Sequence, residues 1–229
     1  MNVPAWVFGD GELVDRRYFS PTRRAAHAAA AGFVAIAIGA CATETETKND
    51  DLEAAPAYDL IEPKAPVLSP DAMSVRLANT INDYRASKGL SRVPLSRALG
   101  IVAKNHAQNI VSHKTEWSPP CNLHSWAAIG GAKACCYPDS HTTPHCMWDK
   151  PRELTGFPGN GFEIAVSVGS GTVTPEVALE MWRMSPHHHD VILNRGMWAD
   201  LPFKSMGAGI VNGVGVVWFS DTADAHGGY

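Results

Sequence analysis

The sequence predicts a layered α+β domain, because helical periodicity in its earlier part gives way to short apolar stretches near its end. Four apolar residues after position 69 recur at helical spacing, and an Asn-Gly pair at 212–213 separates two apolar stretches as in a β-hairpin. The chain has 229 residues, 45% hydrophobic and 18% charged, which is typical of a globular protein with a buried core. Its net charge of −4, without a basic run after residue 24, argues against nucleic-acid binding.

The first 40 residues have the features of an export signal. Two arginines at 23–24 precede an apolar run at 25–40, in which Gly39 and Ala40 stand directly before Cys41. The run is shorter than the roughly 20 residues that cross a bilayer. A small residue before a cysteine resembles a bacterial lipobox. We therefore expect residues 1–40 to be removed and Cys41 to carry a lipid that anchors the protein in the cell envelope, as a periplasmic or outer-membrane lipoprotein. A secreted protein is the alternative.

Residues 41–68 are predicted to be a flexible tether between that anchor and the folded domain. The segment is acidic, has no apolar periodicity, and contains prolines at 56, 63 and 66. The folded domain is expected to span residues 69–229.

Two helices are predicted at the start of this domain. The first begins at Ser69, with a proline and an acid in its first turn, and ends at Gly89. The second begins at Ser96 and carries His106 within its apolar stripe. Such a histidine is more often a core residue bonded to nearby backbone than a ligand, and we interpret His106 in this way.

Residues 112–160 have no periodicity and are predicted to form a long cross-linked loop. Its four cysteines are Cys121, Cys135, Cys136 and Cys146. Behind an export signal, four cysteines predict two disulfides. A bond between neighbours is strained, so Cys121 pairs with either Cys135 or Cys136, and Cys146 with the other. A zinc site that includes the histidines at 141 and 145 is the alternative.

The last third of the chain is predicted to contain an extended segment, a helix and a hairpin. Apolar residues alternate from 162 to 168, which places Glu163 on the opposite side from them. A helix follows Thr174 and ends near Ser185-Pro186, before three successive histidines at 187–189. The hairpin spans residues 206–219.

Five segments of the chain together resemble the CAP superfamily (cysteine-rich secretory protein, antigen 5 and pathogenesis-related 1), also called the SCP domain. They are residues 79–90, 103–107, 161–165, 178–194 and 207–219. Gly-Phe-Glu-Ile-Ala at 161–165 is similar to the Gly-Glu-Asn-hydrophobic-Ala signature of that family. Residues 182–188 are similar to its Trp-x-x-Ser-Pro-Gly-His segment, with His187 in the place of the glycine.

The resemblance implies a three-layer α-β-α sandwich with a cleft lined by two histidines and two acidic residues. The family's histidines fall on His124 and His188, and its first acid falls on Glu163. The second acid has no clean counterpart, because Met184 and Ser185 stand where it is found in many relatives. Glu180 and Asp190 are the nearest acids.

We expect an exported binding module whose cleft binds a divalent, zinc-like metal through His124, Glu163 and His188, or a small or lipidic ligand. Trp126 is expected to contact the ligand, and Trp148 and Trp182 to extend an apolar wall. No catalytic residue is assigned, because the chain has no Gly-x-Ser-x-Gly or His-Glu-x-x-His motif. The alternatives are a metal-assisted hydrolase acting on peptides or cell-wall material and an envelope adhesion module. No protein partner is identified.

Overall fold

A computed structural model describes residues 6–8, 13–14, 70–114, 116–169 and 171–229. Cys41, the predicted tether and most of the predicted export signal lie outside these ranges. Within the described residues, no helix combines the length and the apolar character needed to span a membrane.

The centre of the domain is an antiparallel sheet of five strands in the order β2-β1-β3-β5-β4. Its main strands are β3 (Phe162–Ser167), β4 (Ser205–Val211) and β5 (Val214–Ser220). The β4–β5 hairpin turns at Asn212-Gly213, where Asn212 has a φ of 48°, as the Asn-Gly signal predicts. The predicted hairpin is therefore confirmed.

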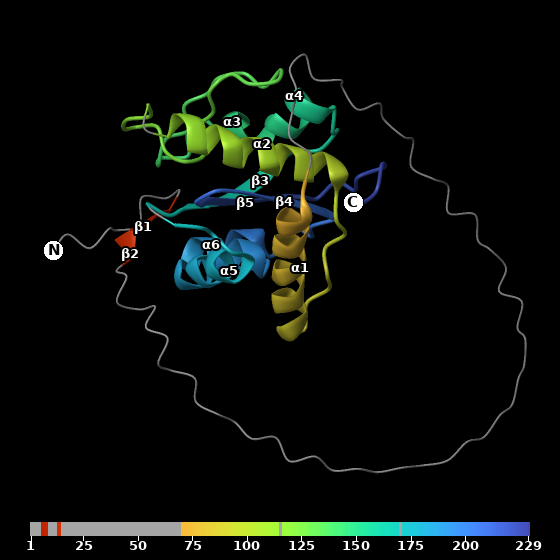
Figure 1. Cartoon of the computed structure of the whole chain (residues 1–229). Helices are drawn as coiled ribbons and strands as arrows, with labels where there is room; N and C mark the ends of the chain where they lie inside the picture. The colour runs from red at the N-terminus through yellow and green to blue at the C-terminus, as the bar shows by residue number, and fades with distance from the viewer. Residues whose placement is uncertain (1–5, 9–12, 15–69, 115, 170) are drawn as a thin grey trace, which may run out of the picture.

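Helices cover both faces of this sheet (Figure 1). One face carries α1 (Ala72–Ser87), α5 (Pro175–Met184) and α6 (Pro186–Ile192), which is followed by the short 3₁₀ helix η2 (Gly196–Trp198). The other face carries α2 (Arg97–His113), α3 (His145–Trp148) and α4 (Lys150–Thr155). The predicted α-β-α sandwich with a disulfide-stapled loop is confirmed.

The strands divide their side chains between two buried clusters. On β3, Ile164 and Val166 pack with α1, α5 and α6, whereas Ala165 packs with α2 and the loop. On β5, Phe219 belongs to the first cluster and Trp218 to the second. Side chains alternate in this way because the pleat has a period of two residues. Glu163 consequently faces α2, on the side that the alternation predicts.

Helix α2 lies unusually close to β4. A Cβ atom on Gly207 would overlap the backbone of Leu99 and Gly100, and a Cβ on Gly209 would overlap that of Ala103 and Lys104. Glycines at these two sheet positions therefore permit the direct contact of helix and strand backbones. This contact fixes the position of α2, which carries His106.

Three details differ from the sequence predictions. The N-cap of α1 is Asp71, whose carboxylate accepts from the Ser74 amide at 2.9 Å, not Ser69. The region expected to be loop contains α3 and α4, which are too short to show a period. Finally, β1 (Trp6–Phe8) and β2 (Leu13–Val14) extend the sheet, although we expected the N-terminus to lie outside the fold. Of the two, β1 pairs along the side of β3 that does not face β5, where backbone groups would otherwise lack strand partners.

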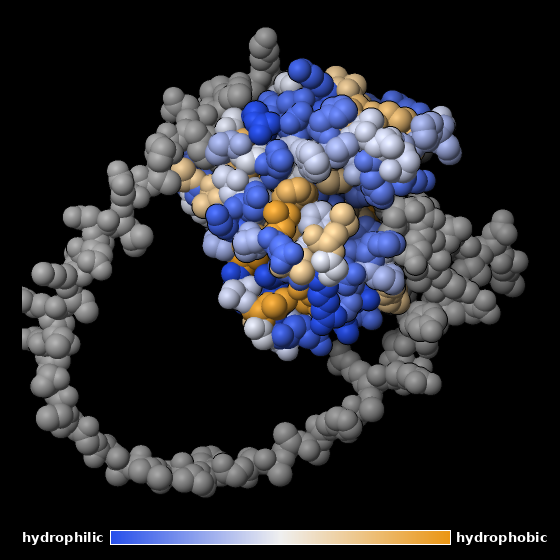
Figure 2. Space-filling model, turned by 180° about the vertical axis from the view of Figure 1, so that it is seen from behind, coloured by the Kyte–Doolittle hydropathy of each residue, from blue (hydrophilic) through white to orange (hydrophobic). Residues whose placement is uncertain are grey.

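The surface seen from behind is mostly hydrophilic, with hydrophobic residues gathered in small patches (Figure 2). Among the described residues, the large hydrophobic side chains that are exposed are Met73, Trp148 and Met197. Two of these three, Trp148 and Met197, line the cavity described next.

Candidate functional site

A cavity of about 920 Å³ lies at the edge of the sheet, beside the first residues of β3. Strand β1 pairs only with the far end of β3, at Val166 and Ser167. Among the described residues, β3 from Phe162 to Ala165 therefore pairs with β5 on one side and with no strand on the other. The cystine-containing loop and α3 line one side of the cavity, and α6 and η2 line the other.

The polar part of the cavity is built around the carboxylate of Glu163. Its Oε1 accepts a hydrogen bond from Nδ1 of His124 over 3.1 Å. Its Oε2 lies 2.8 Å from Nδ1 of His106, close enough for an ion pair but without the alignment of a directional hydrogen bond. The Glu163 side chain is fully buried. One carboxylate thus holds two imidazoles that come from separate segments, α2 and the loop.

The two imidazoles determine the charge state of Glu163. Burial by itself would raise the pKa of this carboxyl, because it disfavours the charged form. The nearby imidazoles of His106 and His124 outweigh burial and lower the pKa of Glu163 to about 2. Glu163 is therefore an anion at neutral pH, and its two oxygens face the two imidazoles.

His106 supports this arrangement from the core. It is fully buried, its ring stacks on Trp126 at 4.1 Å and 12°, and its Nε2 lies 3.2 Å from the Ser125 carbonyl. The predicted core histidine with a backbone contact is thus correct, but we missed its pairing with Glu163. The sequence placed His106 on the apolar stripe of its helix and Glu163 on the side of its segment opposite the apolar residues, so it did not indicate that the two side chains meet.

The three histidines of α6 point in different directions. His188 is 5% exposed, lines the cavity and contacts the Ser185 hydroxyl through Nδ1 at 2.8 Å. His187 is exposed and also lines the cavity. His189 turns to α1 instead, where its Nε2 lies 2.7 Å from the Tyr84 hydroxyl. Successive helical residues are rotated about 100° apart, so one face cannot hold all three.

Of the expected tryptophans, only Trp148 is among the residues that line the cavity. Trp126 is 2% exposed and lies behind His106, where it supports the imidazole and does not face a ligand. Trp182 is fully buried, and its indole donates to the Ala165 carbonyl at 3.3 Å. The apolar wall is formed instead by other side chains, which are those of Met147, Trp148, Phe162, Ile164, Val191, Met197 and Trp198.

The structure places Asp190 and Glu180, the two candidates for the second acid of the family, in different environments. Asp190 of α6 lines the cavity. Glu180 is exposed and pairs with Arg183 at 2.7 Å. Ser185, at the position where relatives have the acid, contacts His188 instead.

Potential metal ligands gather at a different place from the predicted one. Among the described residues, the group of three whose ligand atoms all lie within 4.8 Å of one another is Cys135, His145 and Cys146. The predicted set of His124, Glu163 and His188 does not form such a group. Both oxygens of Glu163 face histidines, Oε1 toward His124 and Oε2 toward His106.

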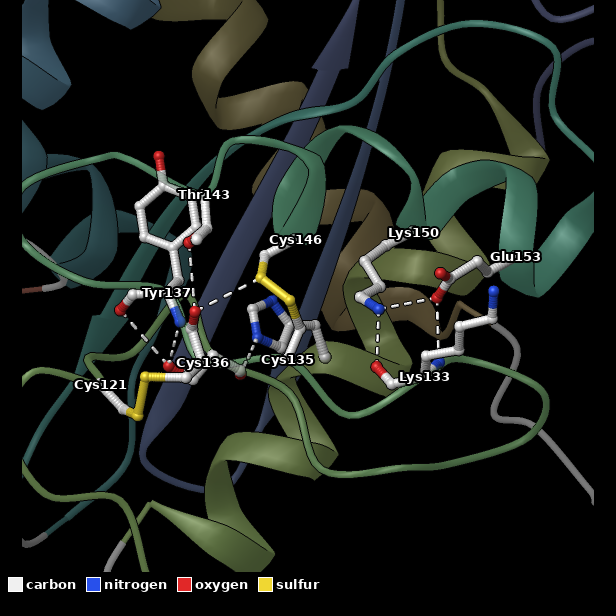
Figure 3. Close-up of a disulfide and its surroundings, with 11 residues drawn as sticks. Cys121, Lys133, Cys135, Cys136, Tyr137, Thr143, Cys146, Lys150 and Glu153 are labelled. Carbon is white, nitrogen blue, oxygen red and sulfur yellow. Dashed lines mark hydrogen bonds and ion pairs between the residues drawn. A yellow bond between two sulfur atoms is a disulfide. The ribbon is translucent and has the colours of Figure 1, made fainter.

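The loop cysteines form two disulfides, Cys121–Cys136 and Cys135–Cys146, with Cα atoms 5.0 Å and 5.5 Å apart (Figure 3). This is one of the two pairings left open by the sequence. Disulfides are typical of proteins that fold in an oxidising compartment. In the same region the buried Lys150 donates to the Lys133 carbonyl at 2.6 Å and to Glu153 at 2.7 Å.

An α-β-α sandwich with a histidine–glutamate pair at the edge of its sheet is the architecture that the family resemblance implies. The model of the cysteine-rich secretory protein family, CAP, matches residues 78–213, which is more than half of the chain. The chain therefore belongs to the CAP family.

Two solved structures are similar to this chain, both at low sequence identity. One is a cysteine-rich secretory protein from Staphylococcus aureus subsp. aureus Mu50, with a TM-score of 0.42, 12% identity, and coverage of 69% of this chain and 41% of that chain. The chain thus spans less than half of the staphylococcal protein. The other is an outer surface protein from Borrelia burgdorferi, with a TM-score of 0.42, 16% identity, and coverage of 68% and 98% respectively. No curated protein matches the chain.

Proposed function

We propose that this protein is an exported binding module whose cavity takes a small amphipathic ligand. The observation that carries the proposal is the mixed lining of the cavity, which combines the imidazoles of His124 and His188 and further polar side chains with the seven apolar side chains of the wall described above. A lipid-like molecule with one polar end fits this lining, because its polar group can hydrogen-bond to an imidazole while its apolar body leaves water.

The size of the cavity supports this proposal. Its volume of about 920 Å³ lies within the range of roughly 300–1,000 Å³ that is typical of small-molecule sites. Met197 is 88% exposed and Trp148 is 39% exposed, so apolar side chains extend from the cavity to the surface. Exposed apolar side chains at a cavity mouth provide a path for an apolar ligand to enter from a membrane or a carrier.

The state of Glu163 favours binding over chemistry. A general base needs a carboxylate or imidazole that can reach the proton of a substrate. Glu163 is fully buried, and both its oxygens face histidines. Its part is to fix the orientation of His124, so that the ring presents its other nitrogen, Nε2, to a partner.

A divalent cation bound by His124 and His188 is the second candidate. Histidines that bind metals usually donate their other ring N–H to a carboxylate, which fixes the tautomer. The contact between His124 and Glu163 is of this kind. If a cation binds here, Glu163 orients His124, which binds the ion, and Glu163 itself does not bind it.

Export and anchoring complete the proposal. Two disulfides are consistent with folding outside the cytosol, and the small residues before Cys41 are consistent with lipid attachment there. One acyl chain binds a membrane only marginally, whereas two or more make anchoring durable. Cys41→Ser is expected to move the protein from the membrane fraction to the soluble fraction. A wild-type protein that keeps the residues upstream of Cys41 would contradict this part of the proposal.

The binding test uses a fluorescent fatty-acid analogue as the probe and, in a separate titration, zinc alone. We expect saturable binding of the fatty acid, weakened at least tenfold by Val191→Asp, which places a charge in the apolar wall. His113→Ala is the matched control, because His113 lies at the end of α2 and pairs with Glu116. Absence of saturable binding, or equal binding by the Val191→Asp variant, would contradict the lipid-like ligand. Zinc binding that His124→Ala abolishes would favour the cation instead.

A further inference from the structure

Cys135, His145 and Cys146 form a cluster of soft ligands in the cystine loop. Their two sulfur atoms and one imidazole nitrogen all lie within 4.8 Å of one another. Two cysteines and one histidine are a typical protein ligand set for zinc, with the remaining position left for water or another donor. The cluster does not include any of the residues that line the cavity.

The disulfide determines whether this cluster can bind an ion. Metals bind the thiolate form of cysteine, and Cys135 and Cys146 are bonded to each other in the structure. A dithiol reductant supplies two electrons and two protons, which break the S–S bond and leave two thiols while the reductant becomes a cyclic disulfide. Binding of a divalent cation then forms two metal–sulfur bonds and releases the two thiol protons.

The backbone keeps both cysteines in place without the covalent bond. The amide and carbonyl of Cys135 pair with the carbonyl and amide of Trp126 at 2.9 Å and 2.8 Å. Cys146 is 1% exposed in α3, and its amide donates to the Thr143 carbonyl at 3.0 Å. Thr143 in turn donates its hydroxyl to the Cys136 carbonyl at 3.1 Å, which ties this turn to the segment that contains Cys135 and Cys136 (Figure 3).

The change in geometry that an ion requires is small. The sulfurs of a disulfide are about 2.05 Å apart, and two sulfurs bound tetrahedrally to zinc at about 2.3 Å are about 3.8 Å apart. Side-chain rotations that move the two sulfur atoms apart by less than about 2 Å therefore open the site. His145 is exposed and adjoins Cys146 in α3, so it can turn to the ion without moving the core.

We propose that Cys135, His145 and Cys146 form a redox-gated site for a zinc-class cation, which binds when a dithiol reduces the disulfide. The cation is released when a disulfide oxidant accepts two electrons from the two thiolates and the Cys135–Cys146 bond forms again. The bound ion takes over the cross-link between α3 and the segment at Trp126. The cross-link affects the cavity, because Met147 and Trp148, which line the cavity, follow Cys146 directly in the chain. The cavity wall thus keeps its position in both redox states. This proposal does not depend on what the cavity binds.

The experiment isolates one cysteine pair in the full-length protein. In a Cys41→Ser/Cys121→Ser/Cys136→Ser variant, cobalt and zinc are titrated into the oxidised and the reduced form, the latter prepared with a metal-free phosphine. We expect the reduced form to bind one equivalent of zinc beyond the oxidised form. Cobalt should show a thiolate-to-metal charge-transfer band, which reports the ligands directly and does not depend on stability.

Two further variants identify the ligands. His145→Ala should weaken the reduction-dependent zinc binding at least tenfold, whereas His113→Ala should leave it unchanged. In the reduced form, zinc should raise the melting temperature of the parent variant but not that of its His145→Ala derivative. Equal metal binding by the oxidised and reduced forms would overturn the proposal, as would a cobalt spectrum without thiolate bands or a His145→Ala derivative that binds as tightly as its parent.

Discussion

The two faces of the sheet are stabilised in different ways. The cluster under α1, α5 and α6 consists of apolar side chains delivered by periodic helices and alternating strands, with the buried Asn82 and Arg85 of α1 donating to backbone carbonyls beside it. The opposite cluster includes α2 and the cystine loop, and beside it lie the buried polar residues His106, Glu163 and Lys150. Each of these polar residues has a partner of opposite charge or a hydrogen-bond acceptor.

The difference follows from the sequence of the covering segments. Helices with an apolar stripe gain stability by burying that stripe. The segment between α2 and α4 has no such stripe, so its position depends on two disulfides, on paired backbone groups and on buried ion pairs. A site that must hold polar side chains in a dry environment is therefore placed on the face that is already held by specific contacts.

The largest expected effect comes from the contact between α2 and β4, on which the second face depends. Gly207→Val places side-chain atoms inside the backbone of Leu99 and Gly100. We expect it to lower the free energy of unfolding by more than about 4 kcal/mol or to prevent folding. Gly169→Ala is the control, because a Cβ there meets nothing within 4 Å. Chemical denaturation followed by circular dichroism measures both, and a Gly207→Val protein of normal stability would show that α2 can move aside.

The second effect concerns the buried carboxylate between two histidines. Glu163→Gln keeps the shape but removes the negative charge that faces His106 and His124. We expect a loss of about 3–5 kcal/mol at neutral pH, the range for breaking a buried ion pair. Glu176→Gln removes a carboxylate whose side chain is 57% exposed and should change stability by less than about 1 kcal/mol. Equal losses in the two variants would mean that burial gives Glu163 no special role.

The pH dependence of stability should report the same carboxylate. The pKa of Glu163 is about 2 in the folded protein, below its ordinary value of 4.5. Its contribution is therefore complete above about pH 4.5 and is lost as the pH falls toward 2. The loss should amount to roughly 3 kcal/mol. Melting temperatures measured across this range should fall less steeply for Glu163→Gln than for the wild type, and parallel curves would assign the acid transition to other groups.

The first face was largely predictable from the sequence. The spacing of Leu77 and Ile81, the cap at Thr174 and the Asn-Gly turn each act locally, so their consequences can be inferred without knowing the fold. The one shift, from Ser69 to Asp71 as N-cap of α1, concerns a choice between neighbouring residues with similar capping ability.

The second face was predictable only in part, because its contacts join residues far apart in the chain. The two histidines and the glutamate were found through the family resemblance, and two disulfides through the count of cysteines. The sequence left the disulfide pairing open, and it did not reveal that Glu163 reaches His106. It also did not place Trp126 behind an imidazole, since its environment is set by α2 and the loop together. Local patterns carry no information about such packing.

The disulfides allow a direct comparison of the two faces. Replacing Cys121 and Cys136 by serine should lower the free energy of unfolding by about 3 kcal/mol, as expected for a loop of this length. The loss should be confined to the second face. Hydrogen exchange should therefore rise in residues 121–146 while the amides of α1 and α5 keep their protection. Uniformly faster exchange would show that the faces unfold as one unit.

The smallest effect is expected from an exposed ion pair on the first face. Arg76 of α1 pairs with Glu176 of α5, and their side chains are 59% and 57% exposed. Water and salt screen such pairs, so Arg76→Ala should cost less than about 1 kcal/mol, and the cost should shrink further in high salt. Lys150→Met offers the contrast, because it removes a charge that is 2% exposed, together with the donor to the Lys133 carbonyl and the cation that faces Glu153. We expect that change to cost several times more and to depend little on salt. If denaturation curves gave the two variants the same cost, polar contacts would contribute equally on both faces, and the distinction between an apolar face and a polar, cross-linked face would fail.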